Sequence, residues 1–419
     1  MRVLFVHQNF PGQYLHLARM LARQRKHQVV GLMMKYPDRP LPQLRGVQVA
    51  AYRPARSSNH EIHPWAIDLE AKLIRAEAAA AGLEKLLAKG FRPDLICAHA
   101  GWGESLFFKD LLPDVPLLTY QEFYYRSSGF DLDFDPEFQP PLEWRRCAGN
   151  RTKTVNPLLS LMASDWSITP TRFQHSTFPS QWQRRISVIH DGINLKAIEQ
   201  AAAVREPTLT LADGTVVRAG EKTITFVNRR LEPYRGCHTF LRAIPAILER
   251  HPQARILIVG GTEGVSYGAR CPQGEWKDVF LREIEGRYDP SRVHFTGAIS
   301  YDNFLILLRL SMVHVYLTYP FVLSWSLLES LASGCAVVGS ATAPVQEVIR
   351  DGENGLLVDF FSPADLAAAV CELLEQPQRR AALAEAAIAT GRSYGLDRCL
   401  PQQLALMEMV AAGVLRAED

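Results

Sequence analysis

The fold of this chain is constrained most by the alternation of strand and helix patterns along almost its whole length. Short runs of apolar residues at 3–6 and 29–32 are typical of buried strands. Between them, over residues 14–22, apolar residues recur every three to four positions, as on one face of an amphipathic helix. A long pattern rich in Ala, Leu, Glu and Lys at residues 66–89 predicts another helix. This order indicates a parallel sheet whose strands are joined by crossover helices.

The alternation is interrupted once, between residues 196 and 222, where the sequence is polar and irregular. Within this stretch Asp213-Gly214 predicts a hairpin turn. A strand, a helix and a second strand then follow at residues 223–227, 240–248 and 256–259. A chain of 419 residues is longer than a domain with a single hydrophobic core usually is. The chain is therefore expected to form two domains.

We therefore predict an α/β fold with two doubly wound, Rossmann-like domains and a cleft between them. The first domain is expected at residues 1–195 and the second at residues 196–399. The sequence from residue 400 to 414 has a helical pattern. This final segment, residues 400–419, is expected to pack back toward the first domain.

Charge is distributed unevenly along the chain, although the net charge is only +2. The first fifty residues hold eight Lys or Arg and one Asp or Glu. A solvated basic face explains this bias, and such a face also permits peripheral contact with an anionic membrane surface. No basic run is interleaved with aromatic residues, which argues against nucleic acid as a partner.

The seven cysteines are scattered and form no C-x-x-C pair, which indicates reduced thiols and argues against a structural zinc site. No apolar run approaches the ~18 residues of a membrane span. The apolar run at residues 1–6 is too short for a signal peptide. We expect a cytoplasmic protein, with contact at the inner face of the membrane permitted by the basic first domain.

A strand, loop, helix and strand are predicted in succession over residues 311–339. Ser324 or Ser326 would begin the helix and Gly334 would end it. A helix N-terminus at the carboxyl end of a parallel strand suits a phosphate group, and Glu329, one turn further, could bind ribose hydroxyls. The alternative is a capping box, in which Ser326 and Glu329 satisfy only the amides of the helix itself.

A second candidate site is the loop at residues 228–236, directly after a predicted strand. It carries Arg230 and Arg235, whose planar side chains suit the bidentate binding of a diphosphate. Glycines at 260, 261 and 264 follow the next strand, but their spacing is not the G-x-G-x-x-G of a dinucleotide site. The first strand–helix loop lacks that pattern too, which argues against a dehydrogenase.

Taken together, these segments resemble the retaining nucleotide-sugar glycosyltransferases of family 4, which have the GT-B fold. Arg230-Leu-x-Pro-x-Arg235-Gly236 is similar to the G-R-L-x-P-x-K-G loop of that family. The residues at 329–338 resemble its E-A-M-A-x-G-x-P-V-V block, and those at 347–358 resemble the block that follows. Further resemblances lie at 188–194 and 295–297.

The resemblance implies metal-independent transfer of a sugar with retained anomeric configuration and without a cofactor. Arg230 and Arg235 would neutralise the diphosphate of a nucleoside-diphosphate sugar, and Glu329 would hold its ribose. Further donor-binding positions would be Gly12, Gly261, Gly297, Ala298 and the backbone of Leu323, Ser324, Trp325 and Ser326.

Two positions depart from the family pattern. The family has a glutamate eight positions before Glu329, and this chain has Phe321 there. A histidine that stands near the sugar in the family is aligned with Glu122, which could assist catalysis, bind a sugar hydroxyl or orient the acceptor. The alternative for Glu122 is an ordinary carboxylate at a strand end. His99 and His190 are further candidates for contact with the sugar or the acceptor, and an ordinary buried role is the alternative for His99.

Asp131, Asp133 and Asp135 have the D-x-D spacing that binds a divalent metal in a different glycosyltransferase fold. Here they lie in an irregular aromatic stretch before Pro136, and Leu142 excludes an EF-hand because it occupies the position of the bidentate glutamate. We predict a loop that faces the acceptor and no metal site.

The sequence thus predicts a retaining hexosyltransferase of glycan, polysaccharide or glycolipid biosynthesis, with a saccharide, lipid-linked or small-molecule acceptor. Because Phe321 and Glu122 replace family residues, a catalytically silent nucleotide-sugar-binding subunit is one alternative. Another is an enzyme of the same fold that hydrolyses or epimerises its nucleotide sugar.

Overall fold

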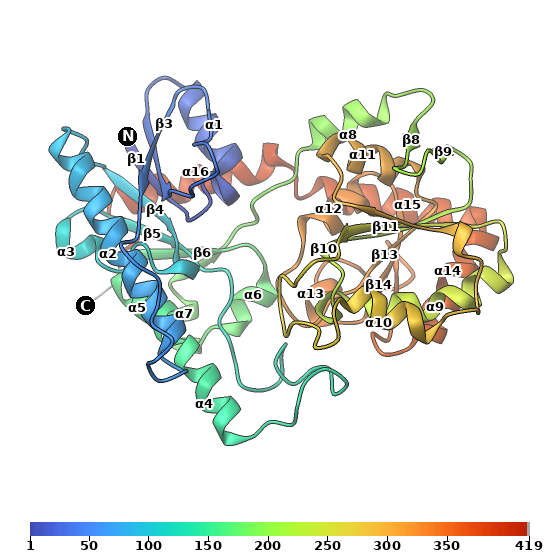
Figure 1. Cartoon of the computed structure of the whole chain (residues 1–419). Coiled ribbons are helices and arrows are strands. Elements are labelled where there is room, and N and C mark those ends of the chain that lie inside the picture. Colours follow the sequence, from blue (N-terminus) through green and yellow to red (C-terminus); the bar gives the residue numbers. More distant parts are fainter. Residues whose placement is uncertain (417–419) are drawn as a thin grey trace. The chain divides into compact units, whose positions relative to one another are not determined.

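The computed structural model describes residues 1–416 and divides them into two compact units. Unit 1 contains residues 1–132, 141–192 and 396–416, and unit 2 contains residues 133–140 and 193–395. Both units contain the doubly wound parallel sheet that the strand and helix patterns predict (Figure 1). The division differs from the predicted one in giving residues 133–140, from the first half of the chain, to unit 2.

The sheet of unit 1 has seven parallel strands in the order β3-β2-β1-β4-β5-β6-β7. Their bounds are β1 (Arg2–Val6), β2 (Gln28–Met34), β3 (Val47–Tyr52), β4 (Leu95–His99), β5 (Leu117–Tyr120), β6 (Trp166–Thr169) and β7 (Ile186–Val188). The strand order reverses between β1 and β4, which is where ligands bind in doubly wound folds, outside the carboxyl ends of the strands.

Side chains alternate across this sheet, as the pleat of a strand requires. On β1, Val3 and Phe5 join the core that includes α1 and α16, whereas Leu4 and Val6 join the core under α2. The helices of unit 1 are α1 (Leu15–Arg23), α2 (Ile67–Ala88), α3 (Phe108–Leu111), α4 (Trp144–Lys153), α5 (Val155–Ala163), α6 (Arg172–Thr177), α7 (Ser180–Gln183) and α16 (Leu396–Ala411). Short 3-10 turns η1 (Gly12–Tyr14) and η2 (Ala100–Trp102) follow β1 and β4.

The sheet of unit 2 has six parallel strands in the order β12-β11-β10-β13-β14-β15. Their bounds are β10 (Thr223–Arg230), β11 (Arg255–Gly261), β12 (Val293–Gly297), β13 (Val313–Tyr316), β14 (Ala336–Ser340) and β15 (Leu356–Val358). The helices are α8 (Leu195–Ala202), α9 (Cys237–Arg250), α10 (Trp276–Glu283), α11 (Tyr301–Leu310), α12 (Trp325–Ala332), α13 (Ala343–Gln346), α14 (Pro363–Glu375) and α15 (Pro377–Arg392), with the turns η3 (Pro233–Arg235) and η4 (Pro290–Arg292).

The irregular stretch predicted at residues 196–222 is more ordered than the sequence indicated. It contains most of α8, whose Ile198 is buried in the core of unit 2, and a hairpin of β8 (Thr208–Thr210) and β9 (Val216–Arg218). The hairpin turn predicted at Asp213-Gly214 is confirmed, since the Asp213 carboxylate accepts a hydrogen bond from the amide of Thr215. In the described part of the chain, no helix is both long and apolar enough to cross a bilayer.

Candidate functional site

The arginine loop begins where β10 ends and continues through η3 into α9. Arg230 is the last residue of β10, and its guanidinium lies against Gly261 at the end of β11, where any side chain would collide with it. The amide of Leu231 donates to the carbonyl of Gly261 at 3.0 Å, which ties the two strand ends together. Glycine at 261 therefore has a local reason, namely room for Arg230.

Arg235 is held more firmly than Arg230. It is only 7% exposed, and its Nη1 donates to Thr318 Oγ1 at 2.8 Å and to the Val322 carbonyl at 3.0 Å. Its guanidinium also lies over the ring of Tyr267, 5.2 Å from the centroid. Gly236 follows in the left-handed conformation, at φ +66°, and packs so closely on Leu317 that a side chain would not fit. The structure thus fixes one arginine of the predicted clamp before a ligand binds.

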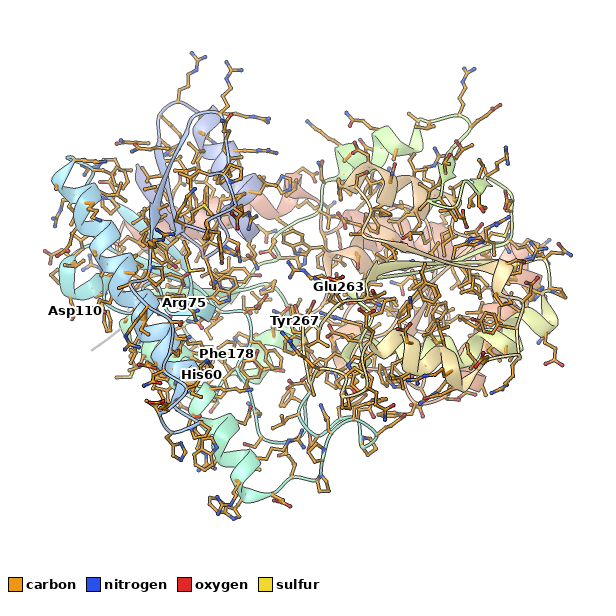
Figure 2. The ribbon with its side chains drawn as sticks, viewed as in Figure 1. His60, Arg75, Asp110, Phe178, Glu263 and Tyr267 are labelled. Atoms are coloured by element: carbon orange, nitrogen blue, oxygen red, sulfur yellow. The ribbon has the colours of Figure 1, made fainter. Side chains whose placement is uncertain are left out.

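Glu232, between the two arginines, is a feature that the sequence did not identify. It is 1% exposed, and its Oε2 accepts hydrogen bonds from the amides of Ser266 and Tyr267 at 2.9 and 3.0 Å. Its Oε1 has no partner among the described residues. Burial raises the pKa of Glu232 to about 7, against the opposing effects of the two amides and the two arginines. The carboxyl group therefore fastens the segment after β11 to the arginine loop (Figure 2 labels Tyr267).

The helix predicted from Ser324 or Ser326 is α12, and Ser324 is its N-cap. The amide of Ser324 donates to the hydroxyl oxygen of Tyr316 at 2.8 Å, and the amide of Ser326 donates to Ser324 Oγ at 3.3 Å. These two amides, predicted to bind phosphate and sugar, are already engaged within the protein. Leu323 is buried before the helix and Trp325 is exposed at its first position.

Glu329 lies inside α12 and is 8% exposed. Its Oε1 accepts a hydrogen bond from the hydroxyl of Tyr301 at 2.7 Å, and burial raises its pKa. The capping-box alternative is wrong, because the N-cap is Ser324 and Glu329 bonds Tyr301 instead of a helix amide. Tyr301 begins α11, so it joins Glu329 to the turn after β12.

That turn contains Gly297 and Ala298, the predicted contacts to the base. Gly297 ends β12 in the left-handed conformation, at φ +66°, and a side chain there would meet nothing within 4 Å. Ala298 is exposed. The arginine loop, Gly261, this turn and the start of α12 all follow the carboxyl ends of strands in one sheet. Unit 2 thus gathers the predicted donor-binding residues, except Gly12, at one edge.

Phe321 is buried in an aromatic cluster of unit 2. Its ring lies 5.6 Å from that of Tyr234 and 4.8 Å from that of Tyr267, and Tyr234 stacks on Tyr319 at 4.5 Å. The family glutamate is thus replaced by a residue that stabilises packing beneath Arg235. The cluster supplies no carboxylate at this position.

The corresponding edge of unit 1 carries two histidines. His99 ends β4, accepts the amide of Gly101 on Nδ1 at 3.1 Å, and stacks between the rings of Trp102 and Tyr120. Burial lowers its pKa well below the usual range, so the ring is neutral and carries its proton on Nε2. That atom lies 4.0 Å from Oε2 of Glu122, whose side chain is 37% exposed.

His7, which directly follows β1, was not among the predicted site residues. Its Nδ1 accepts the amide of Asn9 at 2.9 Å, and its Nε2 donates to Gln13 Oε1 at 2.7 Å. Its ring packs over Gly12, which adopts φ +47°, so a side chain at residue 12 would collide with it. A histidine at a strand end, as in His99, was the signal that could have identified it.

His190 belongs to unit 1, where it forms hydrogen bonds with neighbouring residues of the protein. Its Nδ1 accepts the amide of Gly192 at 3.0 Å, and its carbonyl accepts Nε2 of Gln403 at 2.9 Å. Burial lowers its pKa to about 4. These bonds hold the turn after β7 against α16.

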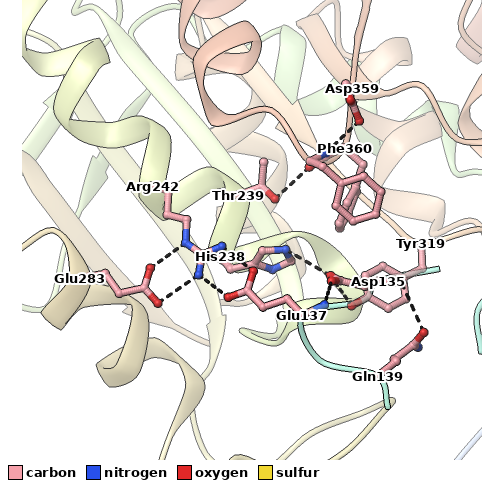
Figure 3. A network of polar contacts seen from close by, with 11 residues as sticks. Asp135, Glu137, Gln139, His238, Thr239, Arg242, Glu283, Tyr319, Asp359 and Phe360 are labelled. Carbon is pink, nitrogen blue, oxygen red and sulfur yellow. Dashed lines mark hydrogen bonds and ion pairs between the residues drawn. The ribbon is translucent and has the colours of Figure 1, made fainter. Parts of the chain in front are cut away.

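The segment of residues 133–140, called the strap below, belongs to unit 2 and includes Asp133 and Asp135 of the stretch that we predicted to face the acceptor. Asp135 is buried in unit 2, where its Oδ2 accepts the hydroxyl of Tyr319 at 2.6 Å and lies 3.4 Å from Nε2 of His238 (Figure 3). Burial alone would raise the pKa of Asp135, but the bonds from His238 and Tyr319 outweigh it and lower the pKa.

Asp135, Glu137 and His238 are close enough together to hold a metal ion. Their oxygens already have donors, however. Both oxygens of Glu137 accept the guanidinium of Arg242, whose Nη1 lies 2.7 Å away, and Oδ1 of Asp135 accepts the amide of Glu137. A cation would have to displace Arg242, so this network is explained as the anchor of the strap.

Two family models match this chain. The one described as Glycosyl transferase family 4 group matches residues 25–198, and the one described as Glycosyl transferases group 1 matches residues 213–390. Together they cover most of the chain.

Curated relatives match over shorter stretches. The D-inositol 3-phosphate glycosyltransferase of Thermomonospora curvata is 29% identical over 200 residues, 44% of this chain and 44% of that protein. The protein of the same name from Acidothermus cellulolyticus is 30% identical over 220 residues, 51% of this chain and 45% of that protein. The matched part is thus less than half the length of these relatives.

Solved structures show the same fold over the whole chain. The α,α-trehalose-phosphate synthase (UDP-forming) of Burkholderia vietnamiensis has a TM-score of 0.74 at 17% identity, covering 100% of this chain and 99% of that one. HepE of Anabaena in complex with UDP-glucose has a TM-score of 0.64 at 16% identity, covering 98% of this chain and 100% of that one. The chain therefore belongs to the family 4 glycosyltransferases and has the GT-B fold.

Proposed function

We propose that this protein transfers a hexosyl group from a nucleoside-diphosphate sugar to an acceptor hydroxyl, with retained anomeric configuration and without a metal ion. The observation that carries the proposal is the arrangement of Arg230 and Arg235 at the edge of unit 2. Arg235 is fixed by Thr318 and Val322, and Arg230 is placed by the gap at Gly261. Two cations in a preformed site suit the charge that develops on a leaving diphosphate.

In this reaction the bond between the anomeric carbon and the β-phosphate oxygen breaks, and its electron pair stays with the diphosphate. The acceptor oxygen bonds the anomeric carbon and loses its proton. Glu122, with its partly exposed side chain near Nε2 of His99, is placed in the proposal as the group that orients or deprotonates the acceptor hydroxyl. Glu329 would bind the ribose, and the turn at Gly297 and Ala298 the base.

UDP is the proposed nucleotide, because the Anabaena protein forms a complex with UDP-glucose and the Burkholderia enzyme is a UDP-forming synthase. The proposed role is in glycan, polysaccharide or glycolipid biosynthesis, with a saccharide, lipid-linked or small-molecule acceptor. The basic first fifty residues would support peripheral contact with the inner face of the membrane.

The first experiment incubates the purified full-length protein with UDP-glucose and follows UDP release and the anomeric configuration of the sugar product by proton NMR. Release of an α-configured product supports retention, whereas a β-configured product excludes it. Binding of UDP-glucose without release of UDP, in the presence of a panel of acceptors, would favour the silent binding subunit suggested by Phe321.

Metal independence is tested in the same assay with excess EDTA. Activity should persist, because Arg230 and Arg235 supply the positive charge. Loss of activity that manganese restores would contradict the proposal. It would then direct attention to Asp135, Glu137 and His238, the group that geometry allows as a metal site.

A further inference from the structure

Unit 1 contains a cavity of about 360 Å³ that none of the predicted site residues lines. Its walls come from the end of β2, the segment at residues 54–60 and the first half of α2. This volume is within the ~300–1,000 Å³ of small-molecule pockets.

The cavity lies at the ligand-binding edge of the unit 1 sheet. Met34, in its wall, is the last residue of β2, and the segment that includes Arg56 and His60 follows β3. The edge is shared with His7, which directly follows β1, and with His99, the last residue of β4. Neighbouring strands lie ~4.8 Å apart, so the cavity is close to the point where the strand order reverses.

Arg75 is the main polar group of the cavity wall. Its Nε donates to the carbonyl of Trp102 at 2.9 Å, and its two terminal nitrogens form no hydrogen bond with other described residues. The backbone bond fixes the plane of the guanidinium and leaves its terminal donors available. Planar paired donors of this kind are suited to a phosphate.

The other charges around the cavity leave Arg75 without an ion pair among the described residues. Arg56 is paired with Glu70 at 2.8 Å. The fully buried Glu104 accepts the hydroxyl of Tyr52 at 2.8 Å, and the charge of Arg75 acts on this carboxyl group from a distance, without a direct ion pair. Ser57 and His60 add further hydrogen-bonding groups to the wall, and Figure 2 labels His60 and Arg75.

The rest of the wall is apolar and includes Met34, Ile67 and Ile74. A cavity with one fixed cation, several other hydrogen-bonding groups and an apolar floor fits a small organic phosphate better than an unsubstituted sugar. A neutral sugar would bring no negative charge to the terminal nitrogens of Arg75, which form no direct ion pair with the described residues.

We propose that this cavity binds a phosphate group carried by the acceptor, as a monoester or diester, through Arg75. The inference rests on the proposed function, since it assigns unit 1 the acceptor. The same phosphate chemistry is found in soluble sugar phosphates and in lipid-linked phosphates.

The test measures binding of glycerol 1-phosphate and of glycerol to the full-length protein by ligand-observed NMR. Arg75→Gln is compared with Arg53→Gln, a matched variant at an exposed position outside the cavity wall. We expect glycerol 1-phosphate to bind the wild type and Arg53→Gln alike. Binding should be at least tenfold weaker in Arg75→Gln, the size of a lost charge-assisted contact, and glycerol should bind none of them.

Equal binding of glycerol 1-phosphate to all three proteins, or equal weakening in both variants, would overturn the proposal. UDP binding is measured in parallel and should be unchanged in both variants. If UDP binds to none of the proteins, the donor proposal fails. The comparison of glycerol 1-phosphate binding still tests whether the cavity binds phosphate through Arg75.

Dodecyl phosphate distinguishes the two sources of the phosphate. Binding at least tenfold tighter than that of glycerol 1-phosphate, and still dependent on Arg75, supports a lipid-linked acceptor. Equal affinity, again dependent on Arg75, supports a soluble one. Dodecyl phosphate binding that does not depend on Arg75 counts against the proposal.

Discussion

Arg230 and Arg235 are held in different ways, although both are assigned to the diphosphate. The guanidinium of Arg235 donates to two protein acceptors, whereas that of Arg230 forms no hydrogen bond with the described residues and lies against Gly261. Arg235 therefore contributes to the stability of unit 2 as well as to binding. Arg230 is available for the ligand alone.

This difference predicts two distinguishable variants. Arg230→Ala and Arg235→Ala should each reduce turnover by roughly 10²-fold or more, as for the loss of one transition-state donor. Only Arg235→Ala should also lower the free energy of unfolding, by about 1–3 kcal/mol, because Thr318 and Val322 lose their donor. Turnover and thermal unfolding are measured together, with the exposed neighbour Arg229→Ala as control. Near-normal turnover in both variants would remove the arginines from the mechanism.

Glu329→Gln tests the ribose assignment. Glutamine keeps an oxygen that can accept the Tyr301 hydroxyl, so the fold should be unchanged. Loss of the charged acceptor should weaken UDP binding by about tenfold to a hundredfold, as measured by calorimetry. Tyr301→Phe, which removes the hydrogen bond and keeps the carboxylate, is the matched control and should weaken UDP binding less than Glu329→Gln does. An unchanged dissociation constant in Glu329→Gln would leave Glu329 a structural partner of Tyr301.

Glu232 predicts a pH-dependent stability. The pKa of Glu232 is about 7 in the folded protein, whereas an unfolded glutamate titrates near ~4.3. Between these values the folded state binds more protons, so the free energy of unfolding falls as pH rises and the loss is complete above about pH 7. Glu232→Gln should reduce the change in the free energy of unfolding across this pH range by up to about 3 kcal/mol.

The measurement is denaturant unfolding from pH 4 to pH 8, with the exposed Glu263→Gln as control (Figure 2). Glutamine can still accept the amides of Ser266 and Tyr267, so the folds should be comparable. A pH profile in Glu232→Gln that matches the wild type would show that the carboxyl group does not titrate in this range.

Among the elements, the strap depends on aromatic and polar anchors for its place in unit 2. Phe134 packs on Tyr319, Phe360 and Phe361, and Phe138 packs on Trp276 and Phe280. Asp135 lies between these two anchors and satisfies the buried hydroxyl of Tyr319.

Asp135→Ala should therefore release the strap. The hydroxyl of Tyr319 would lose its acceptor, at a cost of about 1–3 kcal/mol. We expect limited proteolysis within the strap to become several-fold faster, with Glu285→Ala, an exposed carboxylate beside α10, as control. Cleavage rates that remain equal in the wild type and both variants would contradict an anchoring role for Asp135.

The elements that the sequence predicted are those with a long or uninterrupted pattern. The helix expected at residues 66–89 is α2 (Ile67–Ala88), and the strand expected at 256–259 lies within β11. β3, whose residues 47–52 are only partly buried at the edge of the sheet, carries too weak an apolar signal. The strap has no periodic apolar pattern in its sequence. Its structure depends on contacts with α9 and α10 instead.

For the site, the sequence predicted the residues that a local motif contains. The arginines and Glu329 are examples, and their place at strand ends follows from the alternation of strands and helices. Glu232 and the cavity beside Arg75 could not be predicted. The burial of Glu232 and the surroundings of the Arg75 guanidinium depend on contacts with segments that are distant in the sequence. The hydrogen bond from Gln403 of α16 to the carbonyl of His190 could not be predicted either, for the same reason.

At the scale of the molecule, unit 1 depends on the last helix. Leu406, Met407 and Val410 of α16 are buried in the same core as Val3 and Phe5 of β1. Each such side chain contributes roughly 1.5–3 kcal/mol, so together they approach the ~5–15 kcal/mol that stabilises a whole domain.

Ending the chain at residue 395 should therefore unfold unit 1 and leave unit 2 folded. Calorimetry should show the loss of one transition, whereas a chain ending at residue 412, which keeps α16, should retain both. Two intact transitions in the shorter chain would show that α16 is dispensable for the core.

The path of the chain also sets an order for its synthesis. Residues 133–140 leave the ribosome before the rest of unit 2 exists, and unit 1 lacks α16 until all of unit 2 has been made. The nascent first unit must therefore wait, with the core surface around Val3 and Phe5 uncovered, while more than two hundred residues of unit 2 are made. Such a chain gains from chaperones that bind exposed apolar surface, and it cannot be divided at a single peptide bond into two independent proteins.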